Sequence, residues 1–126
     1  MKEHVPYSEI SDYYNQIKIG LNPLSHIKAH ETIIQIKLFE YMNFSLPIIA
    51  GNFGYMKKYV EENGVGVCVP PDDPVALANA IKDLLLQPEK ITQMGLNGVK
   101  AVDEKYNWQL MSRSYINIIN GLINRV

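Results

Sequence analysis

The stretch Thr-Ile-Ile-Gln-Ile-Lys-Leu-Phe-Glu, from Thr32 to Glu40, is the part of the sequence around which the fold can be built. Thr32 followed three residues later by Gln35 is a capping box, which predicts that a helix opens here. The helix is apolar on nearly every side, as is typical of a helix covered by other elements. Lys37 and Glu40 interrupt it and share one face, because they lie three residues apart. That face is expected to meet solvent in a cleft or a polar ligand, unless the two charges form only a weak surface pair.

Apolar runs before and after this helix predict the strands of a parallel sheet. Ile17–Leu21 lies upstream and is closed by Asn22-Pro23, whereas Pro47–Ala50 and Val65–Val69 lie downstream. Pro47–Ala50 is apolar throughout, as in a strand buried on both faces. Strands that alternate with helices imply parallel pairing with right-handed crossovers. We therefore expect an α/β fold, a partial Rossmann-like unit with a short parallel sheet of about three strands flanked by helices.

The second half of the sequence predicts three more helices. Asp73 is placed to cap a helix whose first position is Pro74, with a buried stripe that ends at Leu85. Glycines in the next helix permit close contact with a neighbouring element. The last helix has a broad apolar face, and Trp108 is expected to pack it onto the domain. The sequence thus predicts helices over residues 8–15, 32–43, 55–62, 74–85, 88–102 and 108–124, with loop at 24–31.

The size and charge of the chain exclude several classes of protein. Its 126 residues predict one domain, residues 1–126, and its 47% hydrophobic content lies above the range of disordered chains. A net charge of −1 gives no general attraction to nucleic acid or anionic membranes. Cys68 is the one cysteine, so the chain cannot form an internal disulfide, and this side chain is expected in the core. No apolar run reaches the roughly 18 residues of a membrane span, and Met1–His4 lacks a signal-peptide core, so we expect a soluble cytoplasmic protein.

Three strands are few for this amount of helix, because sheets usually have about four to six. The sequence is therefore expected to be the second half of a doubly wound domain whose earlier strands lie upstream of Met1. This leaves Ile17–Leu21 as an unpaired edge. Such an edge predicts pairing either with the absent half or with another copy of the chain in a homo-oligomer.

Four segments together resemble the retaining GT-B glycosyltransferases of the glycosyl-transferases group 1 type (family 4-like). The four segments are Lys37–Met42, Leu46–Ala50, Gly64–Pro74 and Glu104–Trp108. The resemblance as a whole runs from about residue 5 to about residue 113. The likeness covers only the C-terminal, donor-binding part of the family's fold. It implies transfer of a sugar from a nucleotide diphosphate sugar to a glycan or lipid-linked acceptor in polysaccharide biosynthesis, without a resident metal or cofactor. It also implies that a missing domain holds the acceptor, that this fragment alone is inactive, and that the full-length protein lies in the cytoplasm, at the inner membrane.

The resemblance assigns the nucleotide end of the donor to residues of the Thr32 stretch. Glu40 matches the family glutamate that accepts hydrogen bonds from the two ribose hydroxyls, a role that suits an acceptor-only carboxylate. The predicted helix opening matches the place where the family binds the donor's diphosphate, because free amides and the helix dipole favour an anion there. The residues of that opening are Thr32, Ile33 and Ile34.

The resemblance extends to three further donor-binding positions and meets one departure. Lys37 would add a positive charge to the diphosphate site, and Val5 and Pro6 match the loop that lines the base pocket. Many relatives carry two glutamates with seven residues between them, and counting back from Glu40 misses Glu31 by one place. Glu31 is therefore the candidate catalytic residue, which would replace the first glutamate and contact the transferred sugar. The alternative is that this protein has no residue in that role.

Other interpretations remain open at this stage. His26, His30 and Glu31 lie close enough in sequence to suggest a metal site, but loop histidines near a sugar pocket, or solvated ones, fit better because no further ligand follows. Gly51–Gly54 either lines a ligand crevice at a strand end or is a turn. A sugar-nucleotide epimerase of the same architecture and a non-catalytic nucleotide-binding or interaction module are the alternative functions.

Overall fold

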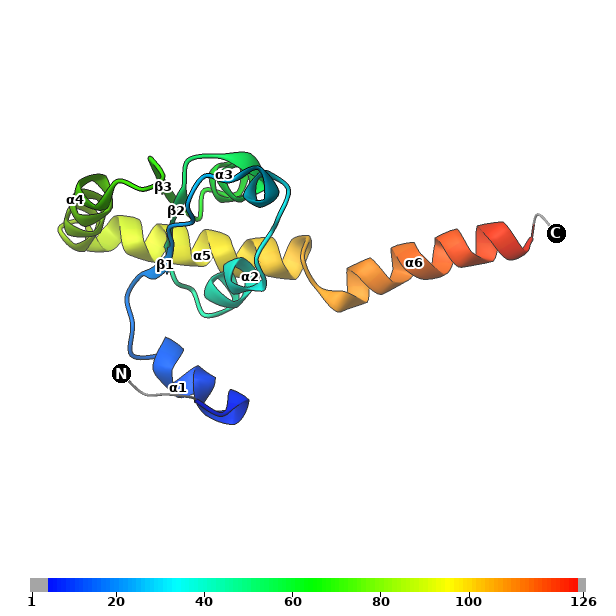
Figure 1. Ribbon diagram of the computed structural model, residues 1–126. Helices are drawn as coiled ribbons and strands as arrows, with labels where there is room; N and C mark the ends of the chain where they lie inside the picture. The colour runs from blue at the N-terminus through cyan, green and yellow to red at the C-terminus, as the bar shows by residue number, and fades with distance from the viewer. Residues whose placement is uncertain (1–4, 125–126) are drawn as a thin grey trace.

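A computed structural model describes residues 5–124 and shows a small sheet covered by helices (Figure 1). The strands are parallel and lie in the order β1-β2-β3, so β1 and β3 are the edges. They are β1 (Gly20–Asn22), β2 (Ile48–Gly51) and β3 (Gly66–Val69). The helices are η1 (Tyr7–Glu9), α1 (Ile10–Tyr14), η2 (Lys28–Glu31), α2 (Ile36–Asn43), α3 (Gly54–Asn63), α4 (Pro74–Leu85), α5 (Pro88–Glu104) and α6 (Trp108–Ile123). The predicted α/β fold, with three parallel strands in chain order, is confirmed.

Each face of the sheet has its own core. On one face, Leu38 of α2 and Val60 of α3 pack with Ile48 and Ala50 of β2. The other face buries side chains from β2, β3, α4 and α5, which are Ile49, Val69, Leu84 and Met94. All four residues of β2 are buried, which confirms that this strand is covered on both faces.

The first strand is shorter than predicted and lies further along the chain. Ile17 and Lys18 are exposed and precede the strand, whereas β1 begins at Gly20 and ends at Asn22. Pairing with β2 decides these limits, because Gly20 lies opposite Ile48 and Asn22 lies opposite Ala50. The aromatic ring of Tyr41 covers Gly20 so closely that a Cβ atom there would overlap it.

The predicted capping box at Thr32 and Gln35 is wrong. Lys28–Glu31, expected to be loop, forms the 3-10 helix η2, and Thr32 ends that turn with φ −107° and ψ 0°. Helix α2 begins only at Ile36, and its N-cap residue Gln35 makes no side-chain capping hydrogen bond. The backbone of Glu31 lies against Gly54 of α3, so tertiary contact holds this segment in place of a longer α2.

The predictions for α4 and α5 hold with one correction. The Asp73 carboxylate accepts a hydrogen bond from the Ala76 amide at 2.9 Å, as predicted for an N-cap. Leu85 does not belong to the buried stripe, because its side chain is half exposed. Gly98 of α5 lies against α2, where an added Cβ would sit 3.0 Å from the Met42 Cα atom. Close contact through the α5 glycines is therefore confirmed.

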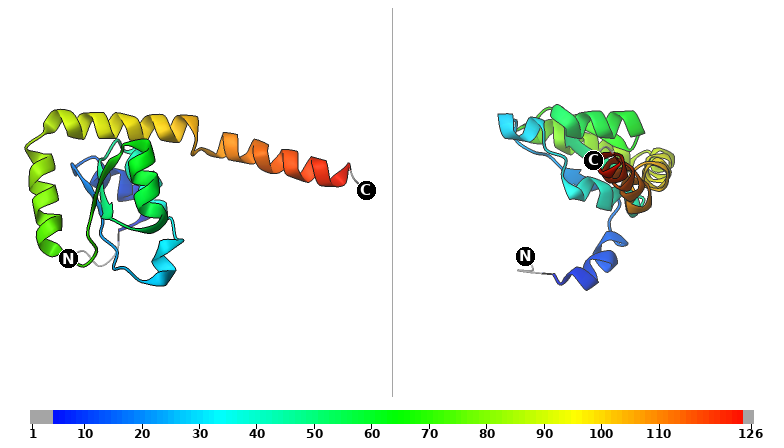
Figure 2. Two further views of the ribbon diagram at one scale, coloured as in Figure 1. Left: turned by 90° about the horizontal axis from the view of Figure 1, so that it is seen from above. Right: turned by 90° about the vertical axis from the view of Figure 1, so that its right-hand side faces the viewer.

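Helix α6 extends away from the rest of the described chain, as Figures 1 and 2 show. None of its residues is buried, and Trp108 is 72% exposed. The expectation that Trp108 packs the last helix onto the domain is therefore wrong. The reason is local: Asn107 caps the helix by accepting a hydrogen bond from the Leu110 amide, and the helix it starts points away from the sheet.

Cys68 lies on β3 and is partly buried. Burial, followed by the nearby charge of Glu61, raises the pKa of this thiol to about 11, although Lys57 acts in the opposite direction. Because the thiolate is the reactive species, we expect iodoacetamide at pH 8 to modify folded Cys68 about 100-fold more slowly than the urea-unfolded chain. Mass spectrometry of timed samples measures both rates, and equal rates would contradict the buried thiol.

None of the helices within residues 5–124 has the length and hydrophobicity of a bilayer-spanning segment. The charged start Met1–His4, used above to argue against a signal peptide, lies outside the described residues.

Candidate functional site

Glu40 lies on the second turn of α2, half-buried, and faces an opening between α1 and α2. The Tyr14 hydroxyl donates a hydrogen bond to Glu40 Oε2 at 2.7 Å. Both side chains line a pocket of about 220 Å³, together with Ser11 and Phe44. An ionised carboxylate accepts several hydrogen bonds, so Glu40 retains acceptor capacity for a ligand in this pocket.

Lys37 lies one turn before Glu40 and lines a neighbouring pocket of about 270 Å³. Val5 and Tyr41 also line it, and Tyr14 borders both pockets. Lys37 and Glu40, both within the described residues, do not form an ion pair with each other. The structure thus brings Val5, Lys37 and Glu40 together around α1 and leaves the two charges apart, which argues against the surface-pair interpretation.

The other residues assigned to the donor lie outside regular helix. Pro6 is exposed, and its carbonyl accepts a hydrogen bond from the Glu9 amide at 2.9 Å. Thr32 and Ile33 are exposed in the segment between η2 and α2, whereas Ile34 is partly buried against the core. These residues do not open the helix as predicted. The amides of a helix N-terminus begin instead at Ile36, four residues later.

Glu31, the candidate catalytic residue, pairs with a histidine. Its Oε1 atom lies 2.9 Å from Nε2 of His26, and both side chains are half exposed. The His26 ring in turn contacts Phe53, with ring centroids 4.8 Å apart. Glu31 does not line the pockets around Glu40 and Lys37. Within residues 5–124, no three histidine, cysteine, aspartate or glutamate side chains lie close enough together to hold a metal ion. His26, His30 and Glu31 therefore do not form such a group.

Asn22, at the carboxyl end of β1, is a buried polar residue that the sequence did not single out. It is only 5% exposed, and its Nδ2 atom has no hydrogen-bond partner in the described structure. The pair Asn22-Pro23 predicted only the end of a strand, which is a common use of these residues. A buried amide without a partner is rare in folded proteins and calls for an explanation.

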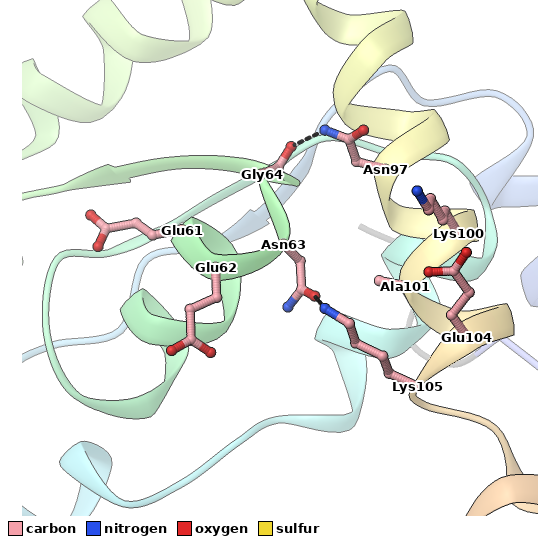
Figure 3. Close-up of a pocket in the computed structure, with 9 residues that line it drawn as sticks. All are labelled: Glu61, Glu62, Asn63, Gly64, Asn97, Lys100, Ala101, Glu104 and Lys105. Atoms are coloured by element: carbon pink, nitrogen blue, oxygen red, sulfur yellow. Dashed lines mark hydrogen bonds between the residues drawn. The ribbon is translucent and has the colours of Figure 1, made fainter.

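A further pocket of about 440 Å³ lies between the end of α3 and the second half of α5 (Figure 3). Its rim is polar and mixed in charge, with Glu62 and Lys100 among its residues. Asn97 donates a hydrogen bond to the Gly64 carbonyl at 2.9 Å, and Lys105 donates one to Asn63 at 3.1 Å. This pocket lies beside Gly64, just before β3, and therefore at the amino end of the sheet. Asn22 lies at the opposite, carboxyl end. The sequence gave no sign of this pocket.

Comparison with known proteins gives one family and several distant relatives. The family described as "Glycosyl transferases group 1" matches residues 2–87. The chain is 27% identical to O-antigen chain mannosyltransferase C of Escherichia coli over 100 residues. This aligned region is 79% of this chain and 26% of that protein. It is 26% identical to a GDP-mannose-dependent alpha-(1-6)-phosphatidylinositol monomannoside mannosyltransferase of Mycobacterium tuberculosis over 76 residues. This second aligned region is 60% of this chain and 20% of that protein.

The fold is shared with a solved glycosyltransferase structure. Sucrose-phosphate synthase from Thermosynechococcus elongatus matches with a TM-score of 0.84 and 24% sequence identity, over 98% of this chain and 30% of that one. The expected GT-B architecture is therefore confirmed. The chain spans between 20% and 30% of the length of these three proteins.

Proposed function

The chain belongs to the glycosyl transferases group 1 family, and from that premise we propose that it binds the nucleotide end of a nucleotide diphosphate sugar. It would act as the donor-binding part of an enzyme that transfers the sugar to an acceptor. The observation that carries the proposal is the position of Glu40, a half-buried carboxylate that lines an open pocket beside Lys37. A ribose offers two adjacent hydroxyl donors, and a carboxylate offers two acceptor oxygens.

The surroundings of Glu40 support a specific orientation for the nucleotide. Val5 shares a pocket with Lys37, so a base in contact with the residue 5–6 segment would lie near the ribose site. Lys37 lies on the first turn of α2, where its charge and the first amides of the helix would both attract the diphosphate. We place the diphosphate at Ile36 and Lys37, with the Thr32–Ile34 segment beside it rather than in the helix.

The proposed chemistry is electrostatic. Sugar transfer requires the bond between the sugar and the diphosphate to break, and positive groups and amide dipoles stabilise the departing diphosphate. Lys37 and the start of α2 would supply part of that stabilisation, with no resident metal or cofactor in the proposal. Glu31 is proposed to contact the transferred sugar, with His26 holding its carboxylate at 2.9 Å. The acceptor, a growing glycan or lipid-linked sugar in polysaccharide biosynthesis, would be bound by residues outside this chain, on the cytoplasmic side of the membrane.

Substitution Glu40→Ala is expected to weaken nucleotide binding about 10- to 100-fold, because it removes two hydrogen bonds to a charged acceptor. The measurement is a calorimetric titration of the 126-residue chain with GDP and with UDP. GDP is the first ligand to test, since one relative is described as GDP-mannose-dependent.

Glu62→Ala is the matched control for this experiment. Glu62 is an exposed carboxylate on α3, and it makes a loose ion pair with Lys58 at 3.9 Å. Its removal is expected to leave the binding constant unchanged. Tight nucleotide binding that survives Glu40→Ala would contradict the ribose role, and the absence of binding by the unsubstituted chain would contradict the proposed function.

A further inference from the structure

The amide of Asn22 is the starting point, because it is buried and lacks a partner. Among the buried residues of the described chain, 5–124, Asn22 is the one with an amide side chain, and Nδ2 is the one buried side-chain nitrogen or oxygen atom there without a hydrogen bond. An unpaired amide that is shielded from water costs the folded state free energy. Such a group calls for a partner, such as a bound water, an ion or a ligand.

The strand register places Asn22 on the sheet face that α2 and α3 cover. Asn22 lies opposite Ala50, which in turn lies opposite Cys68, and residues paired in this way point to the same face. Ala50 belongs to the core cluster formed with α2 and α3. Gly20, two residues before Asn22 and therefore on the same face, lies under the Tyr41 ring of α2. Asn22 is the last residue of β1, so its amide lies at the carboxyl end of this face.

Both helices on this face begin at the same end of the sheet, and neither is capped by a side chain. Helix α3 begins at Gly54, three residues after β2 ends. Helix α2 begins near the level of Asn22, because its end at Asn43 leads after a short turn into the start of β2. The N-cap residues Gln35 and Phe53 make no side-chain capping hydrogen bonds. Of the other α-helices, α4 and α6 are capped by the side chain of the preceding residue, whereas α1 and α5 are not.

We infer that Asn22 Nδ2 donates a hydrogen bond to a diphosphate oxygen of the sugar donor, held between the uncapped N-termini of α2 and α3. This inference rests on the proposed function and adds a positioning residue for the anion. Helix amides and a neutral amide donor together match the acceptor oxygens of a diphosphate. Nδ2 is closed to solvent in the unliganded chain, so a ligand reaches it only after the residues around it move. Binding of the donor thus satisfies an amide that the unliganded fold leaves unpaired.

Asn22→Leu separates this role from a structural one, because it removes the amide and keeps a side chain of similar size. The unliganded variant is expected to melt at the same temperature as the unsubstituted chain or about 3 °C higher, since an unpaired polar group has been removed. Its affinity for GDP or UDP is expected to fall about tenfold, the loss of one hydrogen bond to a charged acceptor. A purely structural asparagine would give the opposite pattern, a lower melting temperature with unchanged affinity.

Asn97→Leu is the matched control, because Asn97 has a hydrogen-bond partner and lies in the pocket of Figure 3, at the amino end of the sheet. It is expected to lower the melting temperature and leave nucleotide affinity unchanged. Asn22→Asp keeps the shape of the side chain and serves if the leucine variant does not fold; its carboxylate is expected to repel the diphosphate and weaken binding more than tenfold. In ¹⁵N-labelled protein, the Asn22 side-chain amide signals are expected to shift on addition of GDP.

The outcomes distinguish this inference from the function on which it rests. If Glu40→Ala weakens nucleotide binding but both Asn22 variants bind as tightly as the unsubstituted chain, the role of Asn22 is overturned and the proposed function stands. Unchanged Asn22 amide signals at saturating GDP would overturn it as well. If the unsubstituted chain binds neither GDP nor UDP, both proposals fail together.

Discussion

Gly66→Val is expected to destabilise the chain by about 3 kcal/mol or more, a large share of the roughly 5–15 kcal/mol that stabilises a typical domain. Gly66 opens β3 and lies opposite Ile48 of β2. A Cβ atom at this position would overlap the Ile48 carbonyl oxygen and lie 2.7 Å from its carbon. The obstacle is backbone, which cannot rotate away as a side chain can, so the two strands must separate. Urea unfolding followed by circular dichroism measures the loss.

Gly121→Ala is the control for this experiment. Gly121 lies within α6, and a Cβ atom added there has nothing within 4 Å. Alanine favours helix over glycine, so this variant is expected to gain about 0.5–1 kcal/mol in helix stability. An unfolding midpoint for Gly66→Val equal to that of the unsubstituted chain would show that β2 and β3 are not paired in this register.

The strands and most helices could be predicted because their signals are redundant. The run before Gly51 is apolar at every position and is bounded by turn residues, so a buried strand was the simplest interpretation. Asp73-Pro74 combines an N-cap residue with the residue favoured at the first helical position, and the structure forms that cap. In both places, local chemistry and tertiary packing require the same conformation.

The Thr32 capping box failed because tertiary contact outweighed a local signal. A capping box is worth only about 1 kcal/mol, and the backbone of Glu31 lies close against Gly54 in the folded chain. The apolar face of α6 failed for a different reason. Its pattern shows that the residues avoid water, but it does not specify which surface covers them, and within the described residues none does.

The candidate site was predictable in part where charge breaks an apolar pattern. A carboxylate on an otherwise apolar helix drew attention to Glu40, the family resemblance gave it a role, and the structure places it at a pocket. Asn22 gave no such signal, because asparagine before proline is a common turn sequence. Only the folded structure shows that its amide is buried and without a hydrogen bond.

Leu38→Ala is expected to cost about 2–5 kcal/mol, whereas Ile36→Ala on the same helix is expected to cost less than about 0.5 kcal/mol. Leu38 is fully buried in the core beneath α2, and Ile36 is 76% exposed. Helix α2 has only eight residues, which is too short to be stable alone, so packing must hold it in place.

The comparison of these two variants bears directly on the site, because α2 carries both Lys37 and Glu40. If packing of Leu38 holds the helix, then Leu38→Ala lowers the free energy of urea unfolding and reduces nucleotide binding only as far as the folded fraction falls. The Ile36 variant keeps its stability, because its side chain is largely exposed. Equal losses of stability for the two variants would mean that α2 is held by its own helical preference rather than by the core, and Glu40 would then rest on a helix that the sheet does not position.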